Sequence, residues 1–183
     1  MQLRIFVRLW CFDESFKIEE NSSKYNFTFL FTLFWQILRK NQIFSFRGFI
    51  QERAWHKAQG KPVGPTHLYF GCRNKDKDFI YREEMEKYVE DGVLTLHTAF
   101  SRDQPEKIYV SHRMRENVEE LWHLIGEKGG HVYVCGDAKM MAKDVRNIVL
   151  ETVEKGGKMS TEDAEKYVKK MEQQKRYSAD VWS

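Results

Sequence analysis

The sequence predicts an α/β fold in which a parallel sheet is flanked by helices. Three short apolar runs have the length and composition of buried strands, at about His67–Cys72, Val93–Phe100 and His131–Cys135. Longer segments with apolar residues at helical spacing separate these runs or follow them. Strands that alternate with helices of this length form parallel sheets, because each crossover helix returns the chain to the same end of the sheet.

The expected helices share apolar residues three to four positions apart and a turn sequence at one end or both. Glycine or proline marks most of these ends, as at Gly60, Asp91-Gly92 and Gly129-Gly130. Gly136-Asp137 is expected to end the third strand, and residues 177–183 are expected to form a short tail. The predicted helical ranges are about Gly48–Gly60, Asp76–Glu90, Ser111–Lys128, Ala138–Lys155 and Ser160–Gln174.

Composition excludes several classes of protein. The 183 residues carry a net charge of only +3 with both signs well mixed, so a nucleic-acid-binding stripe is not expected. The three cysteines are odd in number and widely spaced, which is typical of reduced thiols rather than a disulfide framework. The six histidines show no metal-ligand spacing, and we therefore predict no metal site.

Residues 1–45 differ in character from 46–183, and the domain boundary is placed between them. The apolar run Phe27–Leu38 is shorter than the roughly 20 residues that cross a bilayer, so no membrane span is predicted. One interpretation is that 1–45 is foreign to the fold and poorly ordered. The alternatives are a buried helix or strand, or a segment that lies on a membrane surface.

Polar residues cluster where the second strand ends, and ligands of parallel sheets bind at such carboxyl ends. Arg102 offers a planar set of donors, Lys107 a point charge and Ser101 a hydroxyl, while Tyr109 offers a ring for stacking. In place of the acidic residue typical of NAD enzymes, a basic residue here suits the 2′-phosphate of NADP. The alternative is that these side chains are simply solvated.

The end of the third strand and the last residues of the chain hold a second candidate group. Cys135 precedes Gly136, which lets a ligand approach the backbone closely. Trp182, one residue from the end, has a physical purpose if its indole covers a flat ring, and Asp180 lies two residues before it. The alternatives are a packing role for the buried thiol and a Trp182 ring docked on its own domain.

Six blocks of this sequence carry a resemblance: Phe46–Arg53, Tyr69–Arg73, Phe79–Glu84, Ala99–Arg102, Val132–Ala138 and Arg176–Ser183. Together they resemble the NADPH–cytochrome reductase family, the diflavin enzymes that feed electrons to haem monooxygenases. Each block alone is weak, but all six occur in the family's order, and the Asp-Val-Trp-Ser ending is the most specific of them. The resemblance runs from Phe46 to Ser183.

The resemblance implies a fold and a role for individual residues. The fold is a three-layer, Rossmann-like NADP-binding domain of the ferredoxin-reductase type. Cys135 and Asp180 match residues beside the nicotinamide, and Trp182 matches the aromatic residue that stacks on the flavin of FAD. The implied NADPH contacts are Ser101, Arg102, Lys107, Ile108, Tyr109, Val110, Ser111 and Asp144.

The sequence also departs from the family. Ser111 stands where the family has Gln, and Met140 where it often has Asn. Upstream, Leu38–Ser45 occupies the place of a strand and a Gly-Thr-Gly-Ile-Ala-Pro turn that holds the pyrophosphate. The first strand and the pyrophosphate loop are therefore expected to be missing or replaced, and the FMN-binding and FAD-binding domains are not expected here.

The resemblance implies that the chain is the NADPH-binding part of an NADPH–haemoprotein reductase, with NADPH and FAD as cofactors and haem monooxygenases as partners. The alternative is a truncated NADP-binding fragment without activity of its own, so independent catalysis stays open. For the family the expected location is the cytosolic face of the endoplasmic reticulum membrane. If the chain stands alone, a cytosolic location is expected.

Overall fold

The computed structural model describes residues 43–137 and 140–182 of the chain. Most of the segment 1–45 and the predicted helix start at Ala138 lie outside these residues. The first half contains α2 (Ile43–Ala58), β1 (His67–Cys72), α3 (Lys75–Asp78), α4 (Arg82–Glu90) and β2 (Thr95–Phe100). The second half contains α5 (Val110–Glu116), α6 (Val118–Trp122), the π-helix η1 (His123–Glu127), β3 (Val132–Asp137), α7 (Met141–Gly157), α8 (Thr161–Gln173) and β4 (Tyr177–Trp182).

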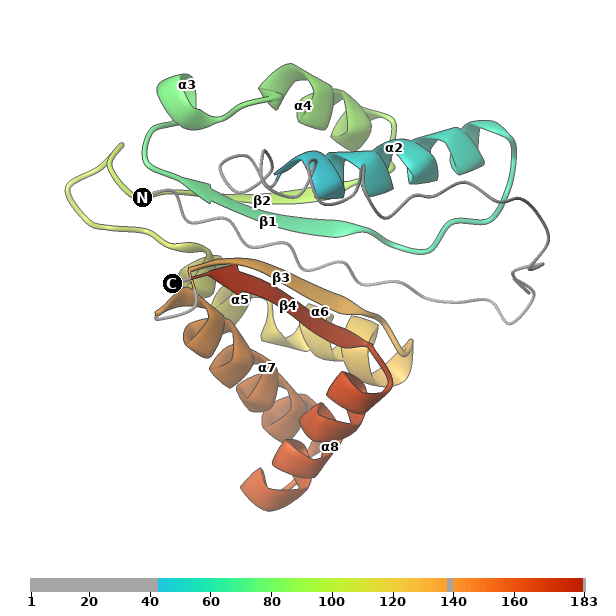
Figure 1. Ribbon diagram of the computed structural model, residues 1–183, viewed down its shortest axis with the longest axis vertical. Coiled ribbons are helices and arrows are strands. Elements are labelled where there is room, and N and C mark those ends of the chain that lie inside the picture. The colour runs from blue at the N-terminus through green and yellow to red at the C-terminus, as the bar shows by residue number, and fades with distance from the viewer. Residues whose placement is uncertain (1–42, 138–139, 183) are drawn as a thin grey trace, which may run out of the picture.

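The strands form two parallel pairs, β1 with β2 and β3 with β4. Figure 1 shows the carboxyl ends of the strands on one side of the molecule. The prediction of an α/β fold with parallel strands is therefore confirmed. Among the described residues the strands form two hydrogen-bonded pairs rather than one continuous sheet.

Two predictions about the second pair were wrong. Gly136-Asp137 does not end the third strand, because both residues continue β3 and pair with Val181 and Trp182. The expected tail is the strand β4, whose first residue, Tyr177, is buried. The guanidinium of Arg176 fixes the start of β4 by donating to the carbonyl oxygens of Ile125 at 2.6 Å and Gly130 at 3.1 Å.

Side chains of β1 alternate between two hydrophobic clusters, because successive residues of a strand point to opposite faces. Leu68, Phe70 and Cys72 pack with α2 and α4, whereas Tyr69 packs with α5 and α6. Both faces of β1 are thus covered, and all six of its residues are buried. The strands consequently lie between α2 and α4 on one side and the remaining long helices on the other (Figure 1).

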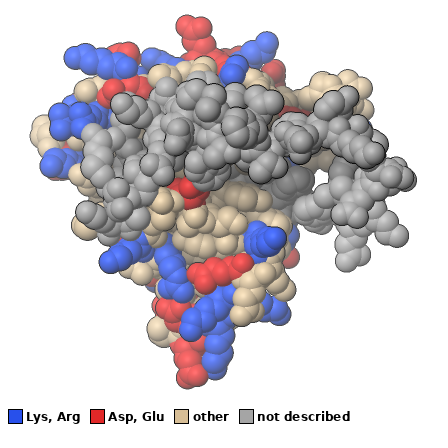
Figure 2. All heavy atoms as spheres, in the orientation of Figure 1, with Lys and Arg blue, Asp and Glu red and all other residues tan. Residues whose placement is uncertain are grey.

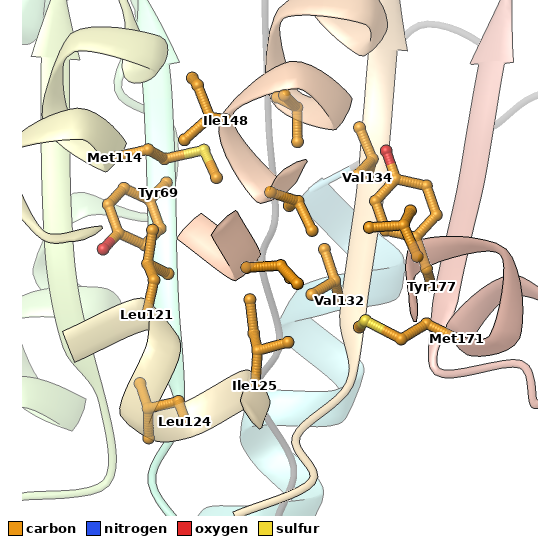
Figure 3. Packing of buried hydrophobic residues seen from close by; sticks show 14 of the residues in the cluster. Tyr69, Met114, Leu121, Leu124, Ile125, Val132, Val134, Ile148, Met171 and Tyr177 are labelled. Atoms are coloured by element: carbon orange, nitrogen blue, oxygen red, sulfur yellow. The ribbon is translucent and has the colours of Figure 1, made fainter. Parts of the chain in front are cut away.

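The larger cluster joins both strand pairs through the helices that cover them. Figure 3 shows residues of β1, α5 and α6 facing residues of β3, β4 and α8, with Ile148 of α7 between them. Burial of a large aliphatic side chain contributes about 1.5–3 kcal/mol, so this cluster is a main source of stability. The labelled members are Tyr69, Met114, Leu121, Leu124, Ile125, Val132, Val134, Ile148, Met171 and Tyr177.

Two predicted helices are interrupted. The predicted helix 76–90 divides into α3 and α4, because Tyr81 adopts a left-handed conformation with φ of 61°. The predicted helix 111–128 divides at Asn117, whose amide donates to the carbonyl oxygen of Arg113 at 3.0 Å. Asparagine competes with the backbone for hydrogen bonds in this way, which explains a break that periodicity alone does not reveal.

The surface carries both signs of charge. Figure 2 shows lysine and arginine interspersed with aspartate and glutamate over the visible face, including the tapered end around α8. Within residues 43–137 and 140–182, no helix combines the length and the apolar character that a membrane crossing requires. The apolar run Phe27–Leu38 lies outside the described residues.

The side chain of Glu84 in α4 forms hydrogen bonds to α2. Its carboxylate accepts from Arg47 Nε at 2.6 Å, from Gln51 Nε2 at 2.9 Å and from the Tyr88 hydroxyl at 3.2 Å. Burial alone would raise the pKa of Glu84, but these donors and the Arg47 charge outweigh it, so the pKa of Glu84 lies below its ordinary value. The pair is about a quarter to a third exposed, which limits its contribution to stability to about 1 kcal/mol.

We expect Glu84→Gln to lower the free energy of unfolding at pH 7 by about 1 kcal/mol. Because the folded-state pKa of Glu84 is depressed, its contribution is present above about pH 4.5 and is lost as pH falls through the lower value. Urea unfolding at pH 7 and pH 3 measures this, with the exposed Glu83→Gln as control. A Glu84→Gln deficit that persists unchanged at pH 3 contradicts the expectation.

Candidate functional site

The loop after β2 is fixed at the carboxyl end of the β1–β2 pair by the backbone. The amide of Ser101 donates to the carbonyl oxygen of Cys72 at 3.0 Å, and that of Arg102 to Arg73 at 2.9 Å. Asp103 accepts from the side chain of Asn74 and from the amide of Lys75, both at 2.9 Å. The loop therefore presents its side chains from a fixed frame, although it contains no regular secondary structure.

A pocket of about 270 Å³ opens at this strand end. Ligand pockets commonly measure roughly 300–1,000 Å³, so this one has room for part of a dinucleotide, such as a phosphate and an adjoining group. Its lining comes from the ends of β1 and β2, from the loop between Ser101 and Tyr109, and from the start of α5. The lining residues are Gly71, Cys72, Arg73, Ala99, Ser101, Arg102, Lys107, Ile108, Tyr109 and Val110.

Three cationic side chains, Arg73, Arg102 and Lys107, line the pocket, and none of the lining residues is acidic. In the described part of the chain, none of these cations has an acidic side chain within ion-pair distance. Arg102 and Lys107 are exposed, and Arg73 is half-buried. Because no carboxylate of the described residues neutralises them, these groups can bind an anion such as a phosphate at little cost.

The neighbouring predicted residues form the wall of the same pocket. Tyr109 is 37% exposed and stacks on His112, with ring centroids 5.9 Å apart. Val110 is fully buried, and Ile108 packs against the larger cluster. Ser111, the next residue, is buried on α5 and does not line the pocket.

The predicted hydride-transfer residues lie on the other strand pair. Cys135 of β3 is buried and is in register with Asp180 of β4, which is exposed. Trp182 is the last residue of β4, but its side chain lies outside the described part of the structure. Asp144 is exposed in the first turn of α7. Cys135, Asp144 and Asp180 do not line the pocket at β1 and β2.

A cluster of His67, His97 and Glu120 was missed from the sequence. These side chains come from β1, β2 and α6, and one possible ligand atom of each lies within 4.8 Å of the others. Burial lowers the pKa of His67 to about 4, and burial followed by the nearby His67 lowers the pKa of His97. The spacing along the chain gives no metal signature; only parallel pairing of β1 and β2 beneath α6 brings the three together.

Comparison with known proteins identifies the type of domain. A family model described as "Oxidoreductase NAD-binding domain" matches residues 43–147, which include both strand pairs except β4. The chain belongs to this family. The match also contains the whole pocket at the ends of β1 and β2.

Several curated proteins similar to this chain share one name. The chain is 62% identical over 138 residues to the NADPH–cytochrome P450 reductase of Musca domestica and 55% identical over 138 residues to that of Drosophila melanogaster. It is 54% identical over 139 residues to that of Bos taurus. Each match covers 75% of this chain, and the chain spans only 20–21% of these relatives. The resemblance inferred from the six sequence blocks is thereby confirmed.

Proposed function

We propose that this domain is the NADPH-binding part of an NADPH–haemoprotein reductase. The observation that carries the proposal is the pocket at the β1–β2 end. It contains Arg73, Arg102 and Lys107, and no acidic side chain among residues 43–137 and 140–182 forms an ion pair with them. The similarity to NADPH–cytochrome P450 reductases supports the same cofactor. Arg102 and Lys107 bind the 2′-phosphate, Ser101 adds a hydroxyl, and Tyr109 stacks on the adenine.

We further propose that the two strand pairs belong to one three-layer, Rossmann-like sheet of the ferredoxin-reductase type. Support comes from the hydrophobic cluster that both pairs share and from helices on both faces of β1. In this arrangement the first strand and the pyrophosphate loop are missing or replaced. Ser111 and Asp144 complete the cofactor contacts, together with Ile108 and Val110 in the pocket wall.

When bound, NADPH supplies a hydride and FAD accepts it. Cys135 and Asp180, in register across β3 and β4, would hold the nicotinamide. The carboxylate of Asp180 would supply a negative charge beside it. Trp182 would supply an aromatic ring to hold the flavin.

The full reductase passes its electrons to haem monooxygenases at the cytosolic face of the endoplasmic reticulum membrane, and FMN carries them onward in the full-length family. The alternative function is that of an NADP-binding fragment without turnover. The experiment has to distinguish it from the reductase function, because this chain spans about a fifth of the length of its relatives. Flavin absorbance of the purified chain and NADPH-driven dye reduction separate the two: stoichiometric FAD with turnover excludes the fragment.

The phosphate site is tested by a pair of ligands that differ by one group. We expect the full chain to bind 2′,5′-ADP at least about tenfold more tightly than 5′-AMP, because only the former carries the 2′-phosphate. Neither ligand has a pyrophosphate bridge, so a missing pyrophosphate loop affects neither. Isothermal titration calorimetry measures both affinities, and equal affinities for the two ligands exclude an NADP-type site.

A further inference from the structure

The cluster formed by His67, His97 and Glu120 lies away from the proposed NADPH site. His67 is the first residue of β1, and His97 is in register with Tyr69, whereas the pocket begins at Gly71, nearer the carboxyl ends. Glu120 approaches from α6, with its Oε1 atom 3.8 Å from Nε2 of His67. The two imidazoles face each other, with Nδ1 of His67 3.3 Å from Nε2 of His97.

The rings are held in place by their surroundings. The side chain of His67 is only 4% exposed. The His97 ring stacks on Tyr69, with centroids 4.3 Å apart and planes 8° from parallel. Nδ1 of His97 lies 3.2 Å from the Asn117 amide nitrogen. Two imidazoles fixed by packing lose little side-chain entropy when they bind a third group, which favours binding.

Without a metal, hydrogen bonds assign the proton positions. The Asn117 amide donates to Nδ1 of His97, so His97 carries its proton on Nε2 and directs it toward Nδ1 of His67. His67 then carries its proton on Nε2, toward Glu120. A cation bound by these side chains takes the place of the protons that lie between them.

We propose that His67, His97 and Glu120 form a site for a divalent transition-metal ion of the zinc type. Imidazole nitrogens with a carboxylate oxygen suit zinc, cobalt, nickel and copper, whereas magnesium and calcium prefer oxygen ligands. Bonds of about 2.1 Å in tetrahedral geometry place ligand atoms roughly 3.4 Å apart. The three atoms lie within 4.8 Å of one another, so the side chains must close by roughly 1–1.5 Å.

The exposure of Glu120 to solvent suits a bound ion that has one coordination position open to water. Glu120 is 48% exposed, so its side chain can move onto the ion and water can complete the coordination. The ion then links β1, β2 and α6, three elements that lie apart along the chain. Its role is structural: it stabilises the strand ends opposite the cofactor pocket, because it binds the folded chain and not the unfolded one.

The test uses the purified full chain after treatment with a chelator. Co²⁺ is added and followed by its visible absorption, and Zn²⁺ then displaces it. We expect one equivalent of Co²⁺ to bind, and Glu120→Gln to weaken the affinity at least about tenfold. Glu119→Gln, an exposed neighbour on α6 with the same charge change, is expected to leave the affinity unchanged.

Two further variants keep the outcome decisive. His123 and Glu127, 2.6 Å apart on the exposed side of η1, are the rival adventitious ligands, so Glu127→Gln is measured in parallel. His67→Leu removes a ligand and places an apolar side chain at this buried position. Circular dichroism checks that the variant is folded. Zn²⁺ is expected to raise the melting temperature of the native chain and not that of Glu120→Gln. No binding, or binding that follows Glu127 rather than Glu120, overturns the proposal.

Discussion

Replacing Gly156 with alanine is expected to lower the free energy of unfolding by about 1–3 kcal/mol or more. A Cβ atom at Gly156 would lie 2.1 Å from Cγ and 2.4 Å from Cβ of Trp122. These atoms are at the base of the indole side chain, so no rotation of a flexible end relieves the overlap. The backbone of α7 or α6 must move instead, which disturbs the buried cluster that both helices cover.

The Trp122 ring is enclosed by glycines on several sides. A Cβ at Gly126 of η1 would lie 2.4 Å from the ring, and one at Gly157 would lie 2.9 Å from it. Urea unfolding of Gly156→Ala measures the effect. In the double variant Gly156→Ala with Trp122→Leu, the loss of unfolding free energy caused by Gly156→Ala is expected to be smaller. The second change removes the ring that the new methyl group meets.

Gly48→Ala is the matched control for this effect. Gly48 also lies inside a helix, α2, but a Cβ there meets no atom of the described residues within 4 Å. Alanine is favoured over glycine in a helix by up to about 1 kcal/mol, so this variant is expected to be as stable as the native chain or more stable. If Gly156→Ala is stabilising as well, Trp122 does not occupy the space described.

Some elements could be predicted from the local sequence pattern alone. The largely apolar run His67–Cys72 predicts β1 with its observed bounds. The serine before α8 caps that helix by accepting from the amide of Asp163 at 3.2 Å. Such signals lie within a few residues of one another, so the sequence carries them directly.

Elements that depend on distant partners could not be predicted. Among residues 177–181 of β4 only Tyr177, at its start, is buried, and their burial does not alternate. The segment is a strand because β3, about 45 residues earlier, pairs with it. The breaks at Tyr81 and Asn117 arise from a left-handed residue and from a side-chain amide that donates to the carbonyl oxygen of Arg113 and also contacts His97 of β2. The six residues predicted between Ser101 and Val110 line one pocket, whereas Cys135 and Asp180 lie on the other pair. Their roles stay predictions.

Arg102→Ala is expected to weaken binding of 2′,5′-ADP roughly ten- to a hundredfold. Charge-assisted hydrogen bonds to a phosphate are worth about 1.5–3 kcal/mol, and the backbone of Arg102, a pocket cation, is anchored to the carbonyl oxygen of Arg73. That anchor is a hydrogen bond from the Arg102 amide, which alanine retains. Because the Arg102 side chain is exposed, its removal should leave the fold intact.

The selectivity of the loss, and not its size alone, identifies the phosphate contact. Affinity for 5′-AMP is expected to be the same in Arg102→Ala and in the native chain, because that ligand has no 2′-phosphate for Arg102 to meet. Lys169→Ala removes the same charge from the exposed face of α8 and is expected to change neither affinity, which separates a local contact from a general electrostatic effect. Calorimetric titration of both ligands into the three proteins measures this. If Arg102→Ala loses the same affinity for both ligands, Arg102 contacts the adenosine or holds the loop in place. If its affinity for 2′,5′-ADP is unchanged, Lys107 and Arg73 are the phosphate ligands.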